Sequence, residues 1–387
     1  MNVLSLFDGM SCGRMALDRL GVKIDNYYAS EIDKYAIIVS KYNFPDIIHI
    51  GDVRDINIEQ LPKIDLLIGG SPCQGFSFAG KQMGSTTKTN IDITSLEQYL
   101  KLKDEGFEFD GQSYLFWEYI YILEEIRKIN PDVKFLLENV MMAKKWKDMF
   151  NSAVGCEPIM INSNLVSAQT RKRLYWTNIL VDGIPEDKHI YLEDILELNE
   201  NTTSKYEFNE DMIKKFEETA RKETKKSING IHQLNNPVFS SNRIYSIDGK
   251  TPTLRASGPC KIRYKCGASR GRYTDPNSNK TTQMMEIRKD YKTSAITTVQ
   301  KDNYIIGLKD EISGQYPMDK FKKSDNITDE FVYRKLTPLE CERLQTLPDN
   351  YTKVPYKNKI MSDNQRYKMI GNGWTVDAIC HLLKKIA

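Results

Sequence analysis

The chain has 387 residues, 40% of them hydrophobic, which is enough for one large domain or two ordinary ones with a sizeable core. Its 55 basic and 52 acidic side chains nearly balance, and no apolar run approaches the roughly 18 residues that a membrane span needs. Residues 1–8 lack the basic stretch and the cleavage site of a signal peptide. These features exclude a membrane-spanning class and predict a cytoplasmic protein with reduced thiols.

Short apolar runs alternate with amphipathic stretches in the first half of the chain, which is typical of a parallel sheet with helical crossovers. Pro131 is expected to stop the longest of the helices. The expected strands are residues 3–7, 26–30, 49–51, 66–69 and 134–137, with 175–177 in a later strand of the same sheet, and the expected helices are 13–20, 34–42 and 115–130.

The pattern changes beyond about residue 184. Residues 235–304 are rich in Thr, Ser, Asn, Gly and Pro with short β-like pieces, which is typical of a smaller, irregular domain. Regular patterning returns at Leu336, where Thr337, Pro338 and Glu340 predict the start of a helix. A last helix is expected at residues 375–385.

Charge is unevenly distributed along the chain. Residues 243–301 carry 13 Lys and Arg against 4 Asp and Glu, although the net charge of the whole chain is only +3. A basic segment on a near-neutral chain indicates either a polyanionic partner or a solvated basic insert.

The seven cysteines are scattered, and no CxxC pair occurs. The nearest two, Cys260 and Cys266, have no histidine beside them, whereas a zinc site usually has four ligands at tight spacing. We therefore expect no metal site.

One thiol has an unusual position. Cys73 directly follows the apolar run 64–69 and the turn Gly70-Ser71-Pro72. This pattern predicts a cysteine at the carboxyl end of a buried strand, directed into a cleft. A thiol in that place is a candidate nucleophile once it is ionised.

The loop after the first expected strand, residues 7–13, is suited to a nucleotide. Gly9 allows close approach of a ligand, and the helix that follows presents its positive end. Glu31 and Asp52 end the next two strands, where ribose hydroxyls and an exocyclic amine would be held. The glycine pattern is not GxGxxG, so NAD is disfavoured. Alternatively, the glycines serve only the turn and the packing of the helix.

A carboxyl group ends another expected strand at Glu138. The ends of neighbouring parallel strands face one cleft, so Glu138 and Cys73 could meet at one substrate, with Glu138 as a proton donor. The alternative is an ordinary polar residue at a strand end. Arg171 and Arg173 would project to the same side of an extended segment and offer two cations, unless they form a solvated basic face.

Six motifs follow one another along nearly the whole chain, and together they closely resemble the cytosine-C5 DNA methyltransferases. Residues 166–168 and Trp374 are most similar to the de novo branch of that family, whereas a glutamine after the cysteine is the common bacterial form. The motifs are Phe7-Asp8-Gly9, Pro72-Cys73-Gln74, Glu138-Asn139-Val140, Gln169-x-Arg171-x-Arg173, RKLTPLECERLQ at residues 334–345, and Gly371-Asn372-Gly373.

The resemblance implies an α/β fold with a Rossmann-like, S-adenosylmethionine-dependent methyltransferase sheet, helices on both of its faces and a smaller, irregular target-recognition domain. The catalytic and cofactor-binding domain would be residues 1–180, completed by 334–387. The target-recognition domain would be residues 181–333.

The resemblance also implies S-adenosylmethionine as cofactor, with S-adenosylhomocysteine as product. Phe7 would stack on the adenine, Glu31 would hold the ribose, Asp52 would accept from the adenine amine, and Asn372 would lie near the methionine part. The full implied set is Phe7, Asp8, Gly9, Ser11, Gly13, Glu31, Ile32, Asp52, Val53, Ser71, Pro72, Asn372, Gly373 and Trp374.

The implied chemistry is methylation of C5 of a cytosine flipped out of duplex DNA. Cys73 would add to C6, Glu138 would hydrogen-bond N3 and the amine, and Arg173, with Arg171 beside it, would hold the base. Residues 74–113 would form a closing loop. Residues 86–112 depart from the family as an insertion. The expected DNA contacts are Gln74, Gly75, Ser77, Arg255, Arg263, Arg270 and Arg272.

We expect double-stranded DNA as partner, a monomeric enzyme encoded by a prokaryote or a phage, and at most a restriction endonuclease that acts separately. Two alternatives stay open. A tRNA cytosine methyltransferase of the same fold would have a much smaller recognition region. A catalytically inactive DNA-binding relative would lack the nucleophile or its partner.

Overall fold

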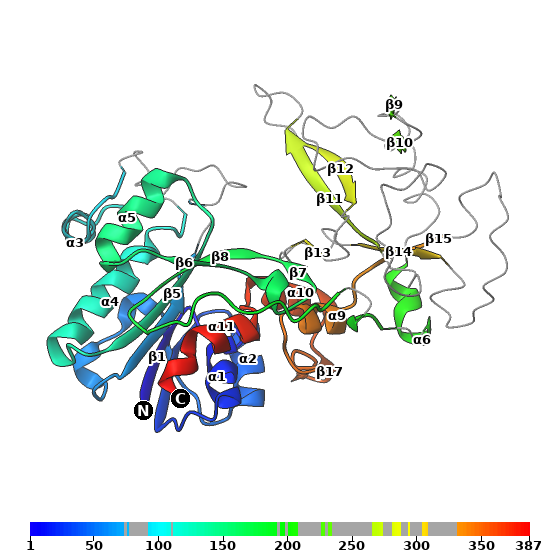
Figure 1. Cartoon of the computed structure of the whole chain (residues 1–387). Coiled ribbons are helices and arrows are strands. Elements are labelled where there is room, and N and C mark those ends of the chain that lie inside the picture. Colours follow the sequence, from blue (N-terminus) through cyan, green and yellow to red (C-terminus); the bar gives the residue numbers. More distant parts are fainter. Residues whose placement is uncertain are drawn as a thin grey trace.

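The computed structural model describes most of the first half of the chain, its end and separate strands between them. The described residues are 1–72, 76, 92–109, 111–191, 194–197, 200–207, 226–228, 231–233, 265–273, 281–287, 293–294, 304–308 and 331–387. A seven-stranded sheet with helices on both faces forms the centre of the described part (Figure 1). This confirms the predicted α/β class.

The order of strands in the central sheet is β3-β2-β1-β4-β5-β8-β6. All the strands expected in this sheet are present, and β5 extends through Glu138. The bounds are β1 (Asn2–Leu6), β2 (Asn26–Ser30), β3 (Ile48–Gly51), β4 (Leu66–Gly70), β5 (Lys134–Val140), β6 (Ile159–Asn162) and β8 (Lys172–Thr177).

The central sheet is parallel from β3 through β5, as predicted, but β8 runs antiparallel to both β5 and β6. The connection from β6 to β8 comprises only residues 163–171. A parallel crossover needs a dozen or more residues, so the chain can return only in the opposite direction.

Alternate residues of the central strands enter two separate cores. In β4, Leu66 and Ile68 pack on one side of the sheet, whereas Leu67 packs on the other. Both faces are therefore apolar, which explains the continuous hydrophobic runs of the strands. Helices α1 (Cys12–Arg19), α2 (Lys34–Asn43), α9 (Pro338–Leu344), α10 (Asp363–Asn372) and α11 (Val376–Leu383) supply the first core, and α3 (Leu96–Asp104), α4 (Leu115–Ile129) and α5 (Lys144–Val154) supply the second.

A second sheet has the order β12-β11-β14-β15. Its last strand, β15, leads directly into α9 and so joins this sheet to the helical layer (Figure 1). The bounds of the smaller elements are α6 (Glu200–Thr203), β7 (Gln169–Thr170), β9 (Lys226–Ile228), β10 (Ile231–Gln233), β11 (Lys265–Tyr273), β12 (Thr281–Ile287), β13 (Thr293–Ser294), β14 (Tyr304–Leu308), β15 (Phe331–Lys335), β16 (Pro355–Tyr356) and β17 (Lys359–Ile360).

The predicted start of α9 is confirmed. Thr337 Oγ1 accepts from the Glu340 backbone N–H at 3.1 Å, and Glu340 Oε2 accepts from the Thr337 N–H at 2.8 Å, which is a capping box. Both Glu340 oxygens also accept from the Arg334 guanidinium, at 2.7 and 2.9 Å, in a fully buried pair. The junction between β15 and α9 is therefore held by charge as well as by backbone geometry.

The division at residues 180 and 334 stays a prediction. The beginning of the predicted target-recognition domain contacts the unit built around the central sheet, because Ile195 and Leu196 are buried in the first core and the Glu197 N–H donates to Glu340 Oε1 at 2.8 Å.

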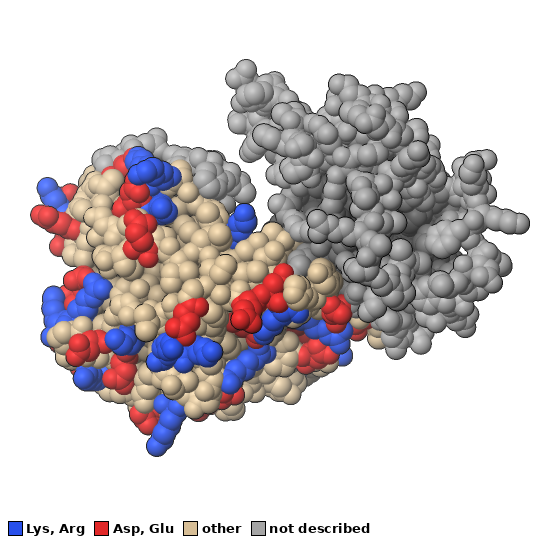
Figure 2. Space-filling view, in the orientation of Figure 1, with Lys and Arg blue, Asp and Glu red and all other residues tan. Residues whose placement is uncertain are grey.

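On the face shown in Figure 2, acidic and basic side chains are interspersed over the described part. None of the helices in the described ranges is long and apolar enough to cross a membrane.

Candidate active site

A cavity of about 1530 Å³ lies at the carboxyl ends of β1, β2, β4 and β5. Residues from both predicted groups, the cofactor-binding and the catalytic, line this one cavity. They are Phe7, Gly9, Glu31, Ile32, Asp52, Val53, Ser71, Pro72 and Asn372 from the first group, and Glu138, Arg171 and Arg173 from the second.

The loop after β1 has an unusual backbone conformation. Phe7, Gly9 and Ser11 all have a left-handed backbone, with φ of 56°, 59° and 66°. This conformation is uncommon for a phenylalanine and marks a position held by its surroundings. The Asp8 N–H donates to Ser30 O at 3.0 Å and the Gly9 N–H to Glu31 Oε2 at 2.8 Å, so the loop is tied to the end of β2.

Asp8 lies behind the cavity wall and is buried. Burial raises the pKa of its carboxyl group to about 6, although hydrogen bonds from Ser11 and Tyr27 act in the opposite direction. Tyr27 OH donates to Asp8 Oδ1 at 2.8 Å, and Ser11 Oγ donates to Oδ2 at 2.5 Å. Asp8 therefore supports the loop that carries Phe7, and it does not line the cavity.

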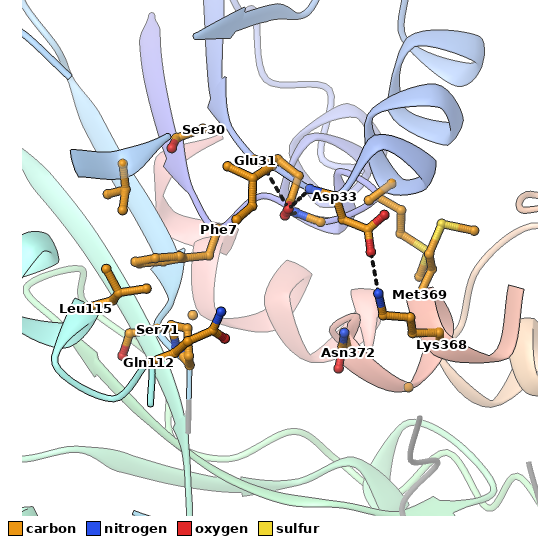
Figure 3. Close-up of a pocket in the computed structure, with 18 of the residues that line it drawn as sticks. Phe7, Ser30, Glu31, Asp33, Ser71, Gln112, Leu115, Lys368, Met369 and Asn372 are labelled. Carbon is orange, nitrogen blue, oxygen red and sulfur yellow. Dashed lines mark hydrogen bonds and ion pairs between the residues drawn. The ribbon is translucent and has the colours of Figure 1, made fainter. Parts of the chain in front are cut away.

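Glu31 projects from the end of β2 and faces the cavity (Figure 3). Its Oε1 accepts from the N–H groups of Ile32 and Asp33, at 2.8 and 2.7 Å, and its Oε2 accepts from Gly9. These bonds fix the orientation of the carboxylate. Each oxygen can accept more than one hydrogen bond, so this carboxylate is also suited to a ligand hydroxyl.

Asp52 caps a short 3₁₀ turn (Val53–Asp55) and pairs with Arg54, with Oδ2 at 2.5 Å from Nη2. Hydrogen bonding from Arg54 lowers the pKa of Asp52. The carboxyl group at this strand end is therefore ionised and acts only as an acceptor.

The cavity is also lined by residues that the sequence did not predict, among them Leu115, Gln112 and Lys368. Leu115 and Gln112 line the wall near Phe7, whereas Asn372 and Lys368 lie on the α10 side, where Lys368 pairs with Asp33 at 2.8 Å (Figure 3). Leu115 is the first residue of α4, and nothing in its local pattern distinguishes it from a core leucine. Gln112 belongs to the 86–112 insertion, so part of that insertion borders the cavity.

The predicted catalytic residues that line the cavity are grouped around Glu138. Glu138 pairs with Gly70 in the register of β5 and β4, and its side chain is only 12% exposed. Arg173 Nε lies 2.9 Å from Glu138 Oε1. Trp374 Nε1 donates to the other oxygen, Oε2, at 3.2 Å. Both carboxylate oxygens thus have a defined partner.

Arg171 and Arg173 both line the cavity, but their guanidinium groups have different partners. Arg171 is buried, and its guanidinium donates to Gly371 O at 3.3 Å and to Gly373 O at 3.0 Å. A direct contact between Arg171 and a base stays a prediction.

Cys73 lies outside the described residues, but the turn before it is described. Asn139 Nδ2 donates to Ser71 O at 3.2 Å and to Ser71 Oγ at 3.1 Å. The strand that carries Glu138 therefore also fixes the turn that leads to Cys73.

Several predicted contacts cannot be placed from the described residues. Arg270 and Arg272 lie on β11, for which the strand pairing but not the side chains is described. The contacts outside the described residues are Gln74, Gly75, Ser77, Arg255 and Arg263.

The remaining predicted cofactor residues, Ser11, Gly13, Gly373 and Trp374, do not line the cavity. For Gly13 the packing alternative fits, because a Cβ there would come within 2.4 Å of Ile68 Cδ1 and the Ile68 side chain would have to move. Gly9 instead lines the cavity, and its left-handed backbone serves the turn.

The whole chain, residues 1–387, matches the family described as C-5 cytosine-specific DNA methylase. It is 25% identical to the orphan methyltransferase M.SPRI of Bacillus phage SPR, with all of this chain and 97% of that protein covered. The orphan methyltransferase M.SPBetaI of Bacillus phage SPbeta is 26% identical over the same shares.

Two solved structures are similar in fold. The methyltransferase EhMeth of Entamoeba histolytica gives a TM-score of 0.58 at 14% identity, with 100% of this chain and 97% of that chain covered. A mutant of DNMT2 from Spodoptera frugiperda gives 0.54 at 17% identity, with 100% and 99% covered. The methyltransferase sheet, the cavity at its strand ends and the match along the full length lead to one conclusion: the chain belongs to the C-5 cytosine-specific DNA methylase family and is a methyltransferase.

Proposed function

We propose that the protein transfers a methyl group from S-adenosylmethionine to C5 of a cytosine that is flipped out of a specific duplex DNA sequence. The observation that carries this proposal is that one and the same cavity is lined both by the Phe7, Glu31 and Asp52 group and by Glu138 with Arg173. A cofactor and a base can therefore meet at the same strand ends.

The residues at one end of the cavity fit S-adenosylmethionine. The Phe7 ring and Leu115 offer apolar contact to an adenine, Glu31 offers a fixed acceptor to ribose hydroxyls, and ionised Asp52 offers an acceptor to the adenine amine. When bound, this cofactor would supply an electrophilic methyl group. Asn372, on the α10 side, would lie near its methionine part.

The residues at the other end fit a flipped cytosine. The Cys73 thiolate would form a bond to C6, which makes C5 a nucleophile, while Glu138 hydrogen-bonds the N3 edge of the base and stabilises the charge that develops. C5 would then take the methyl group, with cleavage of its bond to the sulfonium sulfur and release of S-adenosylhomocysteine. A base removes the C5 proton, the C6–S bond breaks, and the thiolate is regenerated. Arg173 would orient Glu138 and hold the base.

The recognition segment favours DNA over tRNA as substrate. A tRNA methyltransferase of this fold would need a much smaller insert than residues 181–333. The basic stretch 243–301 suits phosphate contacts, which position a protein on a duplex without specifying its sequence. A catalytically inactive relative is disfavoured because Cys73, Glu138 and Arg173 are all present.

We further propose that the protein acts as a monomer in the cytoplasm of a bacterium, on cellular or phage DNA. The two phage relatives are named orphan methyltransferases, which supports a solitary role for this chain. A separately acting restriction endonuclease stays a prediction.

The test has two parts, one that detects the methylated product and one that detects the covalent adduct. Bisulfite sequencing of plasmid DNA exposed to the protein should reveal 5-methylcytosine in one sequence context. An oligonucleotide with 5-fluorocytosine at that position should then form a denaturation-resistant adduct with the wild-type protein and none with Cys73→Ser. Absence of C5 methylation would contradict the reaction, and an adduct that persists in Cys73→Ser would contradict the nucleophile.

A further inference from the structure

Glu138 is held from two directions by groups of different kinds. Arg173, on the neighbouring strand β8, places a cation 2.9 Å from Oε1. Trp374, from the loop after α10, places a neutral N–H 3.2 Å from Oε2. One donor would leave the carboxyl group free to rotate about its last bond, whereas two donors on different oxygens define its plane.

The loop that carries Trp374 is itself firmly anchored. Arg171 donates to the carbonyls of Gly371 and Gly373, on either side of Asn372. Gln345 Nε2 donates to Ile370 O at 2.9 Å and to Gly373 O at 3.2 Å. Thr375 Oγ1 donates to Gln345 Oε1 at 2.8 Å. The indole therefore projects from a backbone that buried side chains hold in place.

Both arginines of the Gln169-x-Arg171-x-Arg173 motif are thus connected by contacts to the Glu138 carboxylate. Arg173 reaches Glu138 Oε1 directly, and Arg171 reaches Oε2 through the loop carbonyls and Trp374.

Gly70 leaves the space in which the indole and the carboxylate meet. A Cβ at this position would lie 2.8 Å from Glu138 Oε2 and 3.0 Å from Trp374 Nε1. The contact between Glu138 and Trp374 therefore depends on the absence of a side chain at Gly70 in β4, as well as on β5 and on the loop that carry the two residues.

From this geometry we infer that Trp374 is a positioning residue for Glu138, and that its indole N–H, held through Arg171, sets the carboxyl plane that faces the target base. This inference rests on the proposed function. It assigns to Trp374 a task different from the cofactor contact expected from the sequence.

The decisive variant is Trp374→Phe, which removes the N–H and keeps an aromatic ring. We expect the single-turnover rate of methyl transfer at saturating cofactor and DNA to fall roughly tenfold to a hundredfold, as for loss of a hydrogen bond to a charged group. The dissociation constant for S-adenosylmethionine should change less than about threefold, because the N–H contacts Glu138 and not the cofactor end.

A double-mutant cycle separates positioning from other roles. In a Glu138→Gln background, Trp374→Phe should have almost no further effect on the residual rate, because residues that act as a unit are not additive. Trp117→Phe is the matched control: within the described structure its buried indole N–H has no partner, so the variant removes no hydrogen bond, and it should lose stability through the cavity left by the smaller ring but keep its rate. An unchanged rate in Trp374→Phe, additive losses in the cycle, or weaker cofactor binding with a normal saturating rate would each overturn the inference.

A spectroscopic measurement tests the hydrogen bond without any reaction. Ultraviolet resonance Raman reports the hydrogen bonding of indole N–H groups. The band that disappears in Trp374→Phe belongs to the Trp374 indole, and Glu138→Gln should shift this band. If the wild-type protein methylates no DNA, the proposed function fails, and the Raman comparison alone decides the inference. A shift then supports the contact, whereas an unshifted band overturns it.

Discussion

Gly70 and Glu138 lie side by side in the paired strands β4 and β5, and the space above Gly70 is filled by the Glu138 carboxylate. Gly70, the residue before the Ser71-Pro72 turn, carries no side chain because Glu138 from the neighbouring strand occupies the space that a side chain would need. This relationship makes Gly70 a sensitive probe of the site.

Gly70→Ala should impair catalysis more than stability. The added methyl group would lie under 3 Å from Glu138 Oε2, and the cheapest relief is a rotation of that side chain away from Trp374. We expect a loss of roughly tenfold or more in the rate of methyl transfer, as for removal of a charge-assisted hydrogen bond. Single-turnover assays and thermal unfolding of the same sample would measure the two effects.

Gly21→Ala is the control for this substitution. Gly21 has a φ of 69° at the end of α1 and open space around its missing Cβ. Alanine there should cost about 1 kcal/mol of stability through backbone strain and leave the rate unchanged. Equal loss of rate in both variants would contradict a specific role for Gly70.

Arg173→Ala should lower turnover roughly a hundredfold, because the removed guanidinium orients the group on which charge stabilisation depends. Lys172→Ala tests whether charge alone is responsible, since Lys172 is the exposed neighbour in β8 and its removal also deletes one cation. The Lys172 variant should keep its turnover and lose only a little DNA affinity. A comparable loss of turnover in both variants would show that net charge, not geometry, matters.

Glu340→Gln should be strongly destabilising. Glu340 is fully buried and accepts from Arg334, from its own capping residue Thr337 and from the Glu197 backbone. Removing its charge leaves Arg334 buried without a counterion, which costs about 3–5 kcal/mol. Chemical denaturation followed by tryptophan fluorescence would measure the change.

An exposed ion pair provides the comparison. Asp349 pairs with Arg343 at 2.6 Å, with side chains 46% and 31% exposed. Asp349→Asn should cost no more than about 1 kcal/mol, because solvent screens such pairs. If the two substitutions cost the same, burial would not be what makes the Arg334–Glu340 pair important.

Asp8→Asn should change how stability depends on pH. Burial raises the pKa of Asp8 from its ordinary 3.8 to about 6, so the folded state binds this proton more tightly than the unfolded state. The unfolding free energy of the wild type should therefore fall as pH rises from about 4 to about 6, by about 3 kcal/mol from this group, and then level off.

Asparagine carries no such charge, so the variant should gain stability relative to the wild type across that pH interval. Denaturation of both proteins at pH 4.5, 5.5 and 7 would reveal the gain, and all other titrating groups cancel in the comparison. A difference that stays constant with pH would mean that Asp8 is not neutralised in the folded protein.

Much of the fold could be read from local sequence. Each strand of the central sheet is a short apolar run with turn residues after it, and Thr337, Pro338 and Glu340 define a helix start through bonds to their own backbone. The order of the motifs also indicated the family. These features depend on neighbours within a few residues, so local pattern alone specifies them.

The separate tasks of the two motif arginines were decided by tertiary structure. Arg171 and Arg173 are two positions apart, yet one donates to a loop beyond residue 370 and the other pairs with a carboxylate on β5. The same holds for Leu115, whose place near Phe7 depends on how α4 packs.

The sequence by itself determined which chemical groups are available and at which strand ends they lie, because alternation and turn chemistry act over short distances. Tertiary structure decided which of these groups touch, because Glu138, Arg173 and Trp374 come from three separate elements and meet only when the sheet and the C-terminal helices are packed.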